Sequence, residues 1–275
     1  MEDYKQKILK SFNKRAKKYD EYSIIQREVA DRLIDRIKMI KINPKKILDI
    51  GSGTGYLSNK LKIIFPQSEI ICLDLSSQML NISKKKYPNL LHLVADAEDL
   101  PFKDSSFDFV LSSFTFHWCK DIDKLLSTII KILNEKGLLI FTTVGPDTLI
   151  ELNNIFKEID NEQHVNDFLD MHIYGDMLLS QGYEDPVVDV EKIKLEYPNL
   201  NTAINSLRET GSNVLLKDKT RKSNMKIKEK YRKFYKNNDY KDIFPITYEL
   251  IYATAWKKNK IKNPESDKII PIKEI

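Results

Sequence analysis

Short apolar runs alternate with amphipathic stretches along most of the chain. The runs are five or six residues long and rich in Ile, Leu, Val and Phe. They cover residues 46–50, 69–74, 91–95, 107–112 and 138–142. Between them, apolar positions recur at helical spacing and predict helices over 55–64, 77–86 and 122–134. This alternation is typical of a parallel sheet with helices on both faces, and the unbroken apolar runs indicate strands buried on both sides.

The regions on either side extend this pattern. Before the first strand, an amphipathic helix is predicted over residues 24–40. After the fifth strand, the pattern predicts helices over 146–159 and 172–181 and strands over 187–197 and 246–256. Gly182 follows the second of these helices, as is common where a helix ends. We therefore expect an α/β fold with a doubly wound, seven-stranded and mostly parallel sheet.

The last two predicted strands are separated by a segment of different character. It is basic, poor in long apolar runs and helical in pattern, so we expect it to be inserted as a lid. The tail is polar and contains Pro264 and Pro271, which favours a flexible end. The predicted division is an N-terminal helical lid segment over 1–40, a core over 41–198 and 246–257, the lid insertion over 199–245 and the tail over 258–275.

Composition narrows the class of protein. The chain has 275 residues, of which 41% are hydrophobic and 31% charged, and this balance favours a globular fold. No apolar run approaches the 18 residues or so of a membrane span, and residues 1–5 are polar, so we expect no membrane partner. Cys72 and Cys119 are too few for a disulfide scaffold and favour a cytoplasmic location. The four histidines have no metal-ligand spacing with either cysteine, so we expect no metal.

Charge is uneven along the chain, although the net charge is only +5. Residues 5–18 hold seven Lys or Arg and no acid, and residues 217–236 hold ten against Asp218 and Glu229. Such stretches attract an acidic partner, for which nucleic acid, an acidic protein and anionic lipid all qualify. The alternative is a solvated face of a lysine-rich protein.

Three glycines alternate directly after the first predicted strand and before a helix, at positions 51, 53 and 55. Glycine permits tight turns and lets a ligand approach the backbone closely. A dinucleotide-binding turn would place its third glycine where Tyr56 stands, and no phosphate-binding Gly-Lys-Ser/Thr sequence is present. The turn therefore suits a nucleoside without a pyrophosphate, with a plain structural turn as the alternative.

Polar residues follow the next strands at the same edge of the sheet. Asp74 comes about 20 residues after the glycines, where an acid can accept hydrogen bonds from ribose hydroxyls, unless it only caps a helix. Asp96 follows the third strand and could accept from an adenine amino group, or be an ordinary loop acid. Residues 112–118 follow the fourth strand and place aromatic and small polar groups where a substrate would meet the nucleoside, or simply pack.

In this order, these features resemble the Rossmann-like S-adenosylmethionine-dependent methyltransferases over about residues 45–145. The resemblance implies S-adenosylmethionine as cofactor. It places the glycine turn under the methionine part, Asp74 at the ribose, and Asp96 with Ala97 beside the adenine. The cofactor-binding positions that it implies are Asp49, Gly51, Gly53, Gly55, Asp74, Leu75, Met79, Asp96, Ala97 and Ser113.

The flanks resemble one family of these enzymes, the malonyl-acyl-carrier-protein O-methyltransferases that begin pimeloyl formation for biotin. The similar segments are residues 11–20, 26–30, 117–119, 141–149, 206–211 and 244–249, so the resemblance runs from about residue 10 to 257. Departures are Ser52, where Cys is common, and Ser113 and His117, where Asn and Gln are common. The resemblance implies methylation of a malonyl carboxylate on an acidic acyl carrier protein, which the basic stretches would dock. We expect a monomer without a nucleic-acid partner, since no aromatic–basic RNA-binding module is visible.

A cation should select a free carboxylate over an ester. Arg208 is the first candidate and Arg27 the second, while Tyr19 is expected to close over the cofactor; each has a plain structural alternative. A second function stays open, because the C-terminal half also resembles a complex I assembly factor that uses the same fold to hydroxylate a protein arginine. Residues 112–113 and 117–118 favour the hydroxylase, and residues 12–14 and 26–28 favour the methyltransferase.

Overall fold

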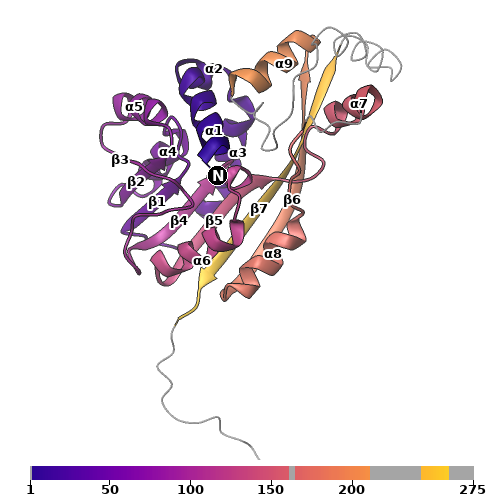
Figure 1. The fold of residues 1–275 in the computed structure, drawn as a ribbon. Helices are drawn as coiled ribbons and strands as arrows, with labels where there is room; N and C mark the ends of the chain where they lie inside the picture. Colours follow the sequence, from indigo (N-terminus) through magenta and orange to yellow (C-terminus); the bar gives the residue numbers. More distant parts are fainter. Residues whose placement is uncertain (1, 161–164, 211–242, 260–275) are drawn as a thin grey trace, which may run out of the picture.

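The centre of the molecule is a seven-stranded sheet, seen in a computed structural model that describes residues 2–160, 165–210 and 243–259 (Figure 1). The strands are β1 Lys46–Ile50, β2 Glu69–Asp74, β3 Leu91–Val94, β4 Phe107–Ser113, β5 Leu133–Val144, β6 Tyr183–Tyr197 and β7 Phe244–Lys257. Their order is β3-β2-β1-β4-β5-β7-β6. β1 to β5 pair in parallel, and β7 is antiparallel to both β5 and β6. The predicted seven-stranded, mostly parallel α/β fold is confirmed.

Helices cover both faces of this sheet. They are α1 Glu2–Arg15, α2 Tyr19–Tyr22, α3 Ile24–Met39, α4 Tyr56–Ile64, α5 Ser77–Lys86, α6 Ile122–Ile132, α7 Ile150–Asp160, α8 Met171–Ser180 and α9 Leu200–Glu209, with 3-10 turns η1 Ala16–Lys18 and η2 Phe116–Trp118. Alternate residues of β1 enter different cores: Ile47 packs with α3 and α4, and Leu48 packs with α6 and α8. The central strands are therefore buried on both sides, as their unbroken apolar sequence predicts.

The edges of the sheet depart from that prediction. β3 and β6 keep many half-buried or exposed positions, because each has a sheet neighbour on one side only.

The helix predicted from residue 146 begins at Ile150. Residues 145–149 instead turn against β7, where the Gly145 and Leu149 amides donate to the Glu249 and Thr247 carbonyls at 2.9 and 2.7 Å. Backbone pairing with a strand that is distant in sequence thus outweighs local helical preference.

The N-terminal region has two parts. α3 packs into the main core through Val29, Leu33 and Ile37, all fully buried. Residues 2–22, which we call the N-terminal strap, instead cross the carboxyl ends of the first strands (Figure 1). A lid role for residues 1–40 stays a prediction.

The predicted insertion over 199–245 begins with α9, which is helical as expected. Its basic stretch over 217–236 and most of the predicted tail lie outside the described residues. Within the described ranges, no helix combines the length and apolar character that crossing a bilayer requires.

Replacing Leu33 by Ala should lower the free energy of unfolding by about 2–5 kcal/mol, because the fully buried side chain leaves a cavity under the sheet. Met39→Ala, at the end of the same helix with its side chain 80% exposed, should change it by less than about 0.5 kcal/mol. Urea denaturation followed by circular dichroism measures both. Equal costs would contradict the assignment of α3 to the core.

Candidate active site

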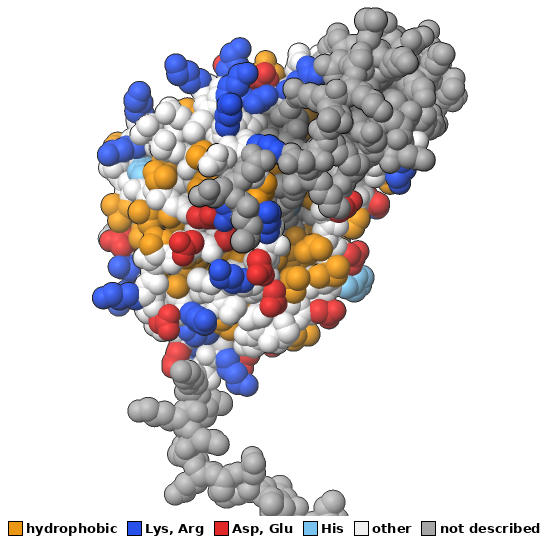
Figure 2. Space-filling model, viewed as in Figure 1, with side chains coloured by type: hydrophobic (Ala, Val, Ile, Leu, Met, Phe, Trp, Pro, Cys, Tyr) orange, Lys and Arg blue, Asp and Glu red, His pale blue; other side chains and the backbone are white. Residues whose placement is uncertain are grey.

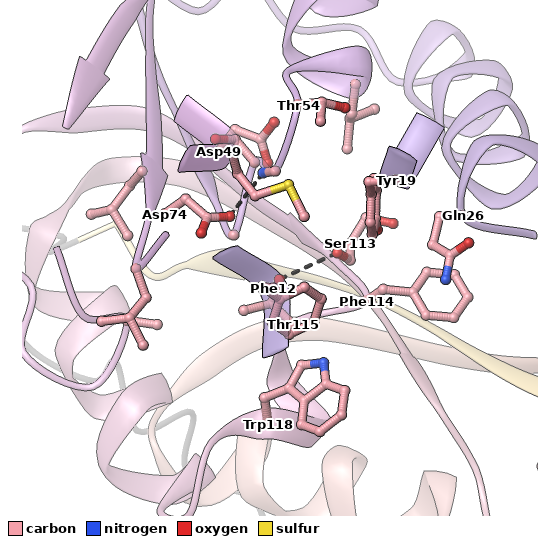
Figure 3. Close-up of a pocket in the computed structure, with 18 of the residues that line it drawn as sticks. Phe12, Tyr19, Gln26, Asp49, Thr54, Asp74, Ser113, Phe114, Thr115 and Trp118 are labelled. Carbon is pink, nitrogen blue, oxygen red and sulfur yellow. Dashed lines mark hydrogen bonds between the residues drawn. The ribbon is translucent and has the colours of Figure 1, made fainter. Parts of the chain in front are cut away.

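A deep pocket opens at the carboxyl ends of β1 to β4 (Figure 3). Its walls come from the loops after these strands, from the N-terminal strap and from the first half of α3. The empty space, including the open mouth, is about 1260 Å³. Open α/β sheets bind ligands at this edge, so the pocket is the candidate ligand site.

The glycine turn forms one wall of the pocket, and β2 holds it in place. The amides of Gly51 and Ser52 both donate to the Leu73 carbonyl, at 2.7 and 3.0 Å. The amide of Gly53 donates to the Asp74 carboxylate at 2.9 Å. Gly51 has a φ of +74°, and a Cβ there would lie 1.9 Å from the Thr115 hydroxyl oxygen. The turn thus needs glycine at position 51 for both its conformation and its packing.

Two carboxyl groups face the pocket beside this turn, Asp49 from β1 and Asp74 from β2 (Figure 3). Burial raises the pKa of Asp49 to about 7; the Ser58 hydroxyl, which donates to it, opposes the shift and the nearby Asp74 adds to it. Burial also raises the pKa of Asp74, against the amides of Ser76 and Gly53. Neither carboxyl forms an ion pair within the described part of the chain. The pair favours a ligand that brings positive charge.

The loop after β3 is tied to the N-terminal strap. The Asp96 carboxylate accepts a hydrogen bond from Lys5, and its other oxygen accepts from the Glu98 amide at 2.9 Å. Glu98 in turn pairs with Lys5 at 2.8 Å and accepts from the Tyr4 hydroxyl at 2.8 Å. Asp96 lines the pocket but already has a cationic partner, so an adenine amino group would share it.

The opposite side of the pocket carries a guanidinium. Nη2 of Arg27 lies 3.7 Å from the Asp20 carboxylate, and Cζ lies 5.3 Å from the centre of the Tyr56 ring. Asp20 also accepts from the Thr54 hydroxyl at 2.6 Å, which anchors it to the glycine turn. Among the described residues, neither the buried Nε of Arg27 nor the buried amide oxygen of Gln26 has a hydrogen-bond partner. This side therefore holds polar atoms that a second ligand could satisfy.

Aromatic rings close the remaining wall. Phe12 from the strap packs edge-on against Trp118 at 5.7 Å between ring centres, and the His117 ring lies 4.9 Å from that of Trp118. Burial lowers the pKa of His117 to about 3, and its Nδ1 has no hydrogen-bond partner. Burial, together with Asp74 and Asp20, raises the pKa of Tyr19 well above its usual value. Both rings are therefore uncharged at neutral pH.

The fold brings most of the predicted site residues together. The lining includes Tyr19, Arg27, Asp49, Gly51, Gly53, Asp74, Leu75, Met79, Asp96, Ala97 and Ser113. Gly55 does not line the pocket: it precedes α4, and a Cβ there would lie 2.2 Å from the Ser83 hydroxyl of α5, so it serves helix packing. Arg208 is exposed on α9 and is not a lining residue, although Thr210 is.

Three lining residues that were not predicted as site residues are Lys5, Asp20 and Gln26. They carry no motif, and only membership of the similar segments 11–20 and 26–30 could have suggested Asp20 and Gln26. Within the described ranges, no three His, Cys, Asp or Glu side chains are grouped to hold a metal ion.

Solved structures share this fold at low sequence identity. A protein from Bacillus halodurans superposes with a TM-score of 0.59 at 17% identity, covering 83% of this chain and 98% of that one. Phosphoethanolamine N-methyltransferase 2 of Haemonchus contortus, in complex with S-adenosylmethionine, gives 0.53 at 22% identity over 84% of this chain and 53% of that one. The [4+2]-cyclase SpnF gives 0.52 at 15% identity over 83% and 82%. Since the last is not named a methyltransferase, fold alone does not fix the reaction.

Sequence comparison is more specific. Residues 48–141 match the family model described as "Methyltransferase domain". The malonyl-[acyl-carrier protein] O-methyltransferase of Gallionella capsiferriformans is 33% identical over 97% of this chain and 95% of its own length. The protein of the same name from Legionella pneumophila is 33% identical over 91% and 90%, and one from Coxiella burnetii 31% identical over 98% and 94%. The chain belongs to the malonyl-[acyl-carrier protein] O-methyltransferase family.

Proposed function

We propose that the protein transfers the methyl group of S-adenosylmethionine to the free carboxylate of a malonyl thioester carried by an acyl carrier protein. The observation that carries this proposal is the extent of the similarity. It spans 97% of the chain. It therefore includes the N-terminal strap and α3, which build the substrate side of the pocket, as well as the glycine turn and its neighbours. In this role the product ester would begin a pimeloyl chain for biotin.

The pocket suits the proposed cofactor in charge and in shape. Asp49 and Asp74 offer two carboxyls without a basic partner, which matches a ligand that is positively charged at its sulfur and amino groups. Gly51 and Gly53 keep the turn beside them free of side chains. We assign the methionine part to this end. The ribose would then bind Asp74, and the adenine would lie among Leu75, Met79, Asp96 and Ala97, with Ser113 toward the substrate.

The chain does not need to deprotonate the substrate. A carboxylate with a pKa near ~4 is already ionised at neutral pH. In keeping with this, His117 and Tyr19 are held uncharged and are poor general bases. When bound, S-adenosylmethionine would supply an electrophilic methyl group on its sulfonium. The task of the protein is to align the carboxylate and to exclude water, and such orientation accounts for roughly 7–11 kcal/mol of barrier reduction in favourable cases.

We assign the selection of the carboxylate to Arg27. Its guanidinium lines the pocket, is oriented by Asp20 and Tyr56, and keeps Nε free to donate. Gln26, on the same helix, lies toward Phe114 and offers a further polar group (Figure 3). Arg208 stays a candidate from the sequence, but its exposed position on α9 gives it less support.

Water exclusion falls to the N-terminal strap. It is held to three successive loops at the sheet edge: by Asp20 to Thr54, by Asn13 to Ser76 at 2.6 Å, and by Lys5 to Asp96. Tyr19 lies near the carboxyl end of the strap and lines the pocket with a protonated hydroxyl. We propose that Tyr19 covers the cofactor from this side.

The arginine hydroxylase and assembly-factor alternatives receive less support. The relatives reported above are named methyltransferases over nearly their full length, and none is named a hydroxylase or an assembly factor. An assay that follows the methyl group of S-adenosylmethionine separates methylation from hydroxylation, because hydroxylation would leave no methyl group on the acceptor.

The proposed activity predicts that S-adenosylmethionine labelled in its methyl group transfers the label to malonyl carrier protein. The label should be released by mild base, since the product is an ester. Acetyl carrier protein, which lacks the free carboxylate, should accept none. Label that resists base, or equal labelling of both acceptors, would overturn the proposed substrate.

Arg27→Gln should raise the KM for the malonyl substrate by roughly 10–100-fold, as expected for loss of a hydrogen bond to a charged group of about 1.5–3 kcal/mol. The dissociation constant of S-adenosylmethionine, measured by calorimetry, should stay within about twofold. Arg208→Gln serves as the matched comparison. If it has the larger effect on KM, the carboxylate is bound from α9 instead.

The raised pKa of Asp49 predicts that cofactor binding depends on pH. Its pKa is raised to about 7, so it is mostly protonated at pH 5.5, and a cationic ligand must displace that proton. The affinity for S-adenosylmethionine should therefore rise by up to roughly tenfold between pH 5.5 and 7.0. Calorimetry in buffers of different ionisation enthalpy should detect the released proton. Asp49→Asn should remove the slope; an unchanged slope in this variant would assign it to another group.

A further inference from the structure

Five exposed lysines from two distant stretches of the sequence gather beside the pocket mouth. Lys14 lies at the end of α1, Lys17 and Lys18 lie in η1, and Lys84 and Lys85 lie in the last turn of α5. α5 packs against both α1 and η1, which brings the two stretches together. We call these residues the lysine patch. Figure 2 shows blue side chains along the corresponding upper edge of the molecule.

The positive charge of the patch is not balanced. None of its five lysines forms an ion pair within the described residues, whereas the adjacent Lys86 pairs with Asp20. Asp20 is the acid that follows η1 in the chain, and it is already engaged by Thr54 and Lys86, so it does not neutralise the patch. Each of these lysines lies in the last turn of its helix or 3-10 turn, where a positive charge favours the helix dipole. That local effect does not require the two stretches to lie together, which the packing of α5 on α1 and η1 brings about.

The patch adjoins the active site. Tyr19 and Asp20 line the pocket, and they directly follow Lys17 and Lys18 in the chain. Lys86, which follows Lys84 and Lys85 on α5, forms an ion pair with the same Asp20. A protein bound over the lysines would therefore have its surface next to the pocket mouth, where a flexible arm could carry an acyl group inward.

We infer that the lysine patch is the docking surface for the acidic carrier protein that bears the malonyl thioester; this inference rests on the function proposed above. An acidic helix of the carrier complements a surface of one sign, and such complementarity mainly speeds association and weakens with salt. The basic stretch over 5–18 predicts part of this surface from sequence. Lys84 and Lys85 join it only through the packing of α5 on the strap.

Two double variants test the patch independently, Lys84→Glu with Lys85→Glu and Lys17→Glu with Lys18→Glu. Each should lower kcat/KM for malonyl carrier protein at least about tenfold at low salt. Each should leave kcat/KM within about twofold for malonyl N-acetylcysteamine, a small thioester that needs no docking. The wild-type rate with the carrier protein should fall as salt is added, and the variants should show a shallower fall.

Lys103→Glu with Lys136→Glu is the matched control. It makes the same change in charge at exposed positions near the amino ends of β4 and β5, and it should behave as wild type with both thioesters. Binding of fluorescently labelled carrier protein, followed by anisotropy, provides a readout independent of turnover. Retained binding in both patch variants, or equal loss with both thioesters, would overturn the docking surface. A wild-type protein that methylates neither thioester would instead overturn the proposed function.

Discussion

The pocket depends on how the end of β2 holds the turn that follows β1. Two backbone amides of the turn, at Gly51 and Ser52, share the carbonyl of Leu73, and a third, at Gly53, binds the side chain of Asp74. These bonds can form only because β1 and β2 are parallel neighbours whose carboxyl ends lie together. They place Asp74 next to Asp49 at a cost, since burial raises the pKa of both carboxyls and neither has a counter-ion among the described residues. A cationic ligand would offset this cost.

Most of the architecture follows from hydrophobic pattern. The inner strands and the helices between them are continuous, strongly apolar or strongly periodic elements, so their existence and order could be predicted. Misplaced boundaries occur where a partner distant in sequence decides the local structure. The start of α7 is one such case, because Gly145 and Leu149 pair with β7 in place of the first helical turn. The edge strands β3 and β6 differ from the prediction in burial, because the sequence does not reveal which strand lacks a second neighbour.

The candidate site also has one part that could be predicted from the sequence and one part that could not. The inner half, from Asp49 to Ser113, lies at strand ends, and an alternating fold places strand ends together, so Asp74 and Asp96 could be predicted from position alone. The outer half comes from the strap and α3. Asp20 and Lys5 reach the pocket through contacts with Thr54 and Asp96, which leave no periodic trace in the sequence. Gly55 is the reverse case: its place in the motif suggested ligand contact, but it does not line the pocket, and its missing side chain makes room for α5.

The position of β7 has a consequence for how the protein folds during its synthesis. This strand lies between β5 and β6: it pairs with β6 along its whole length and with β5 over residues 250–256. Ribosomes make chains from the amino end, so residues 244–257 emerge after every other strand of the sheet. Until then, β5 has an open side along residues such as Ile140 and Phe141, which are buried in the finished sheet. Late in translation, the nascent chain therefore exposes the unpaired edge of β5. We expect chaperones to bind this edge until β7 inserts.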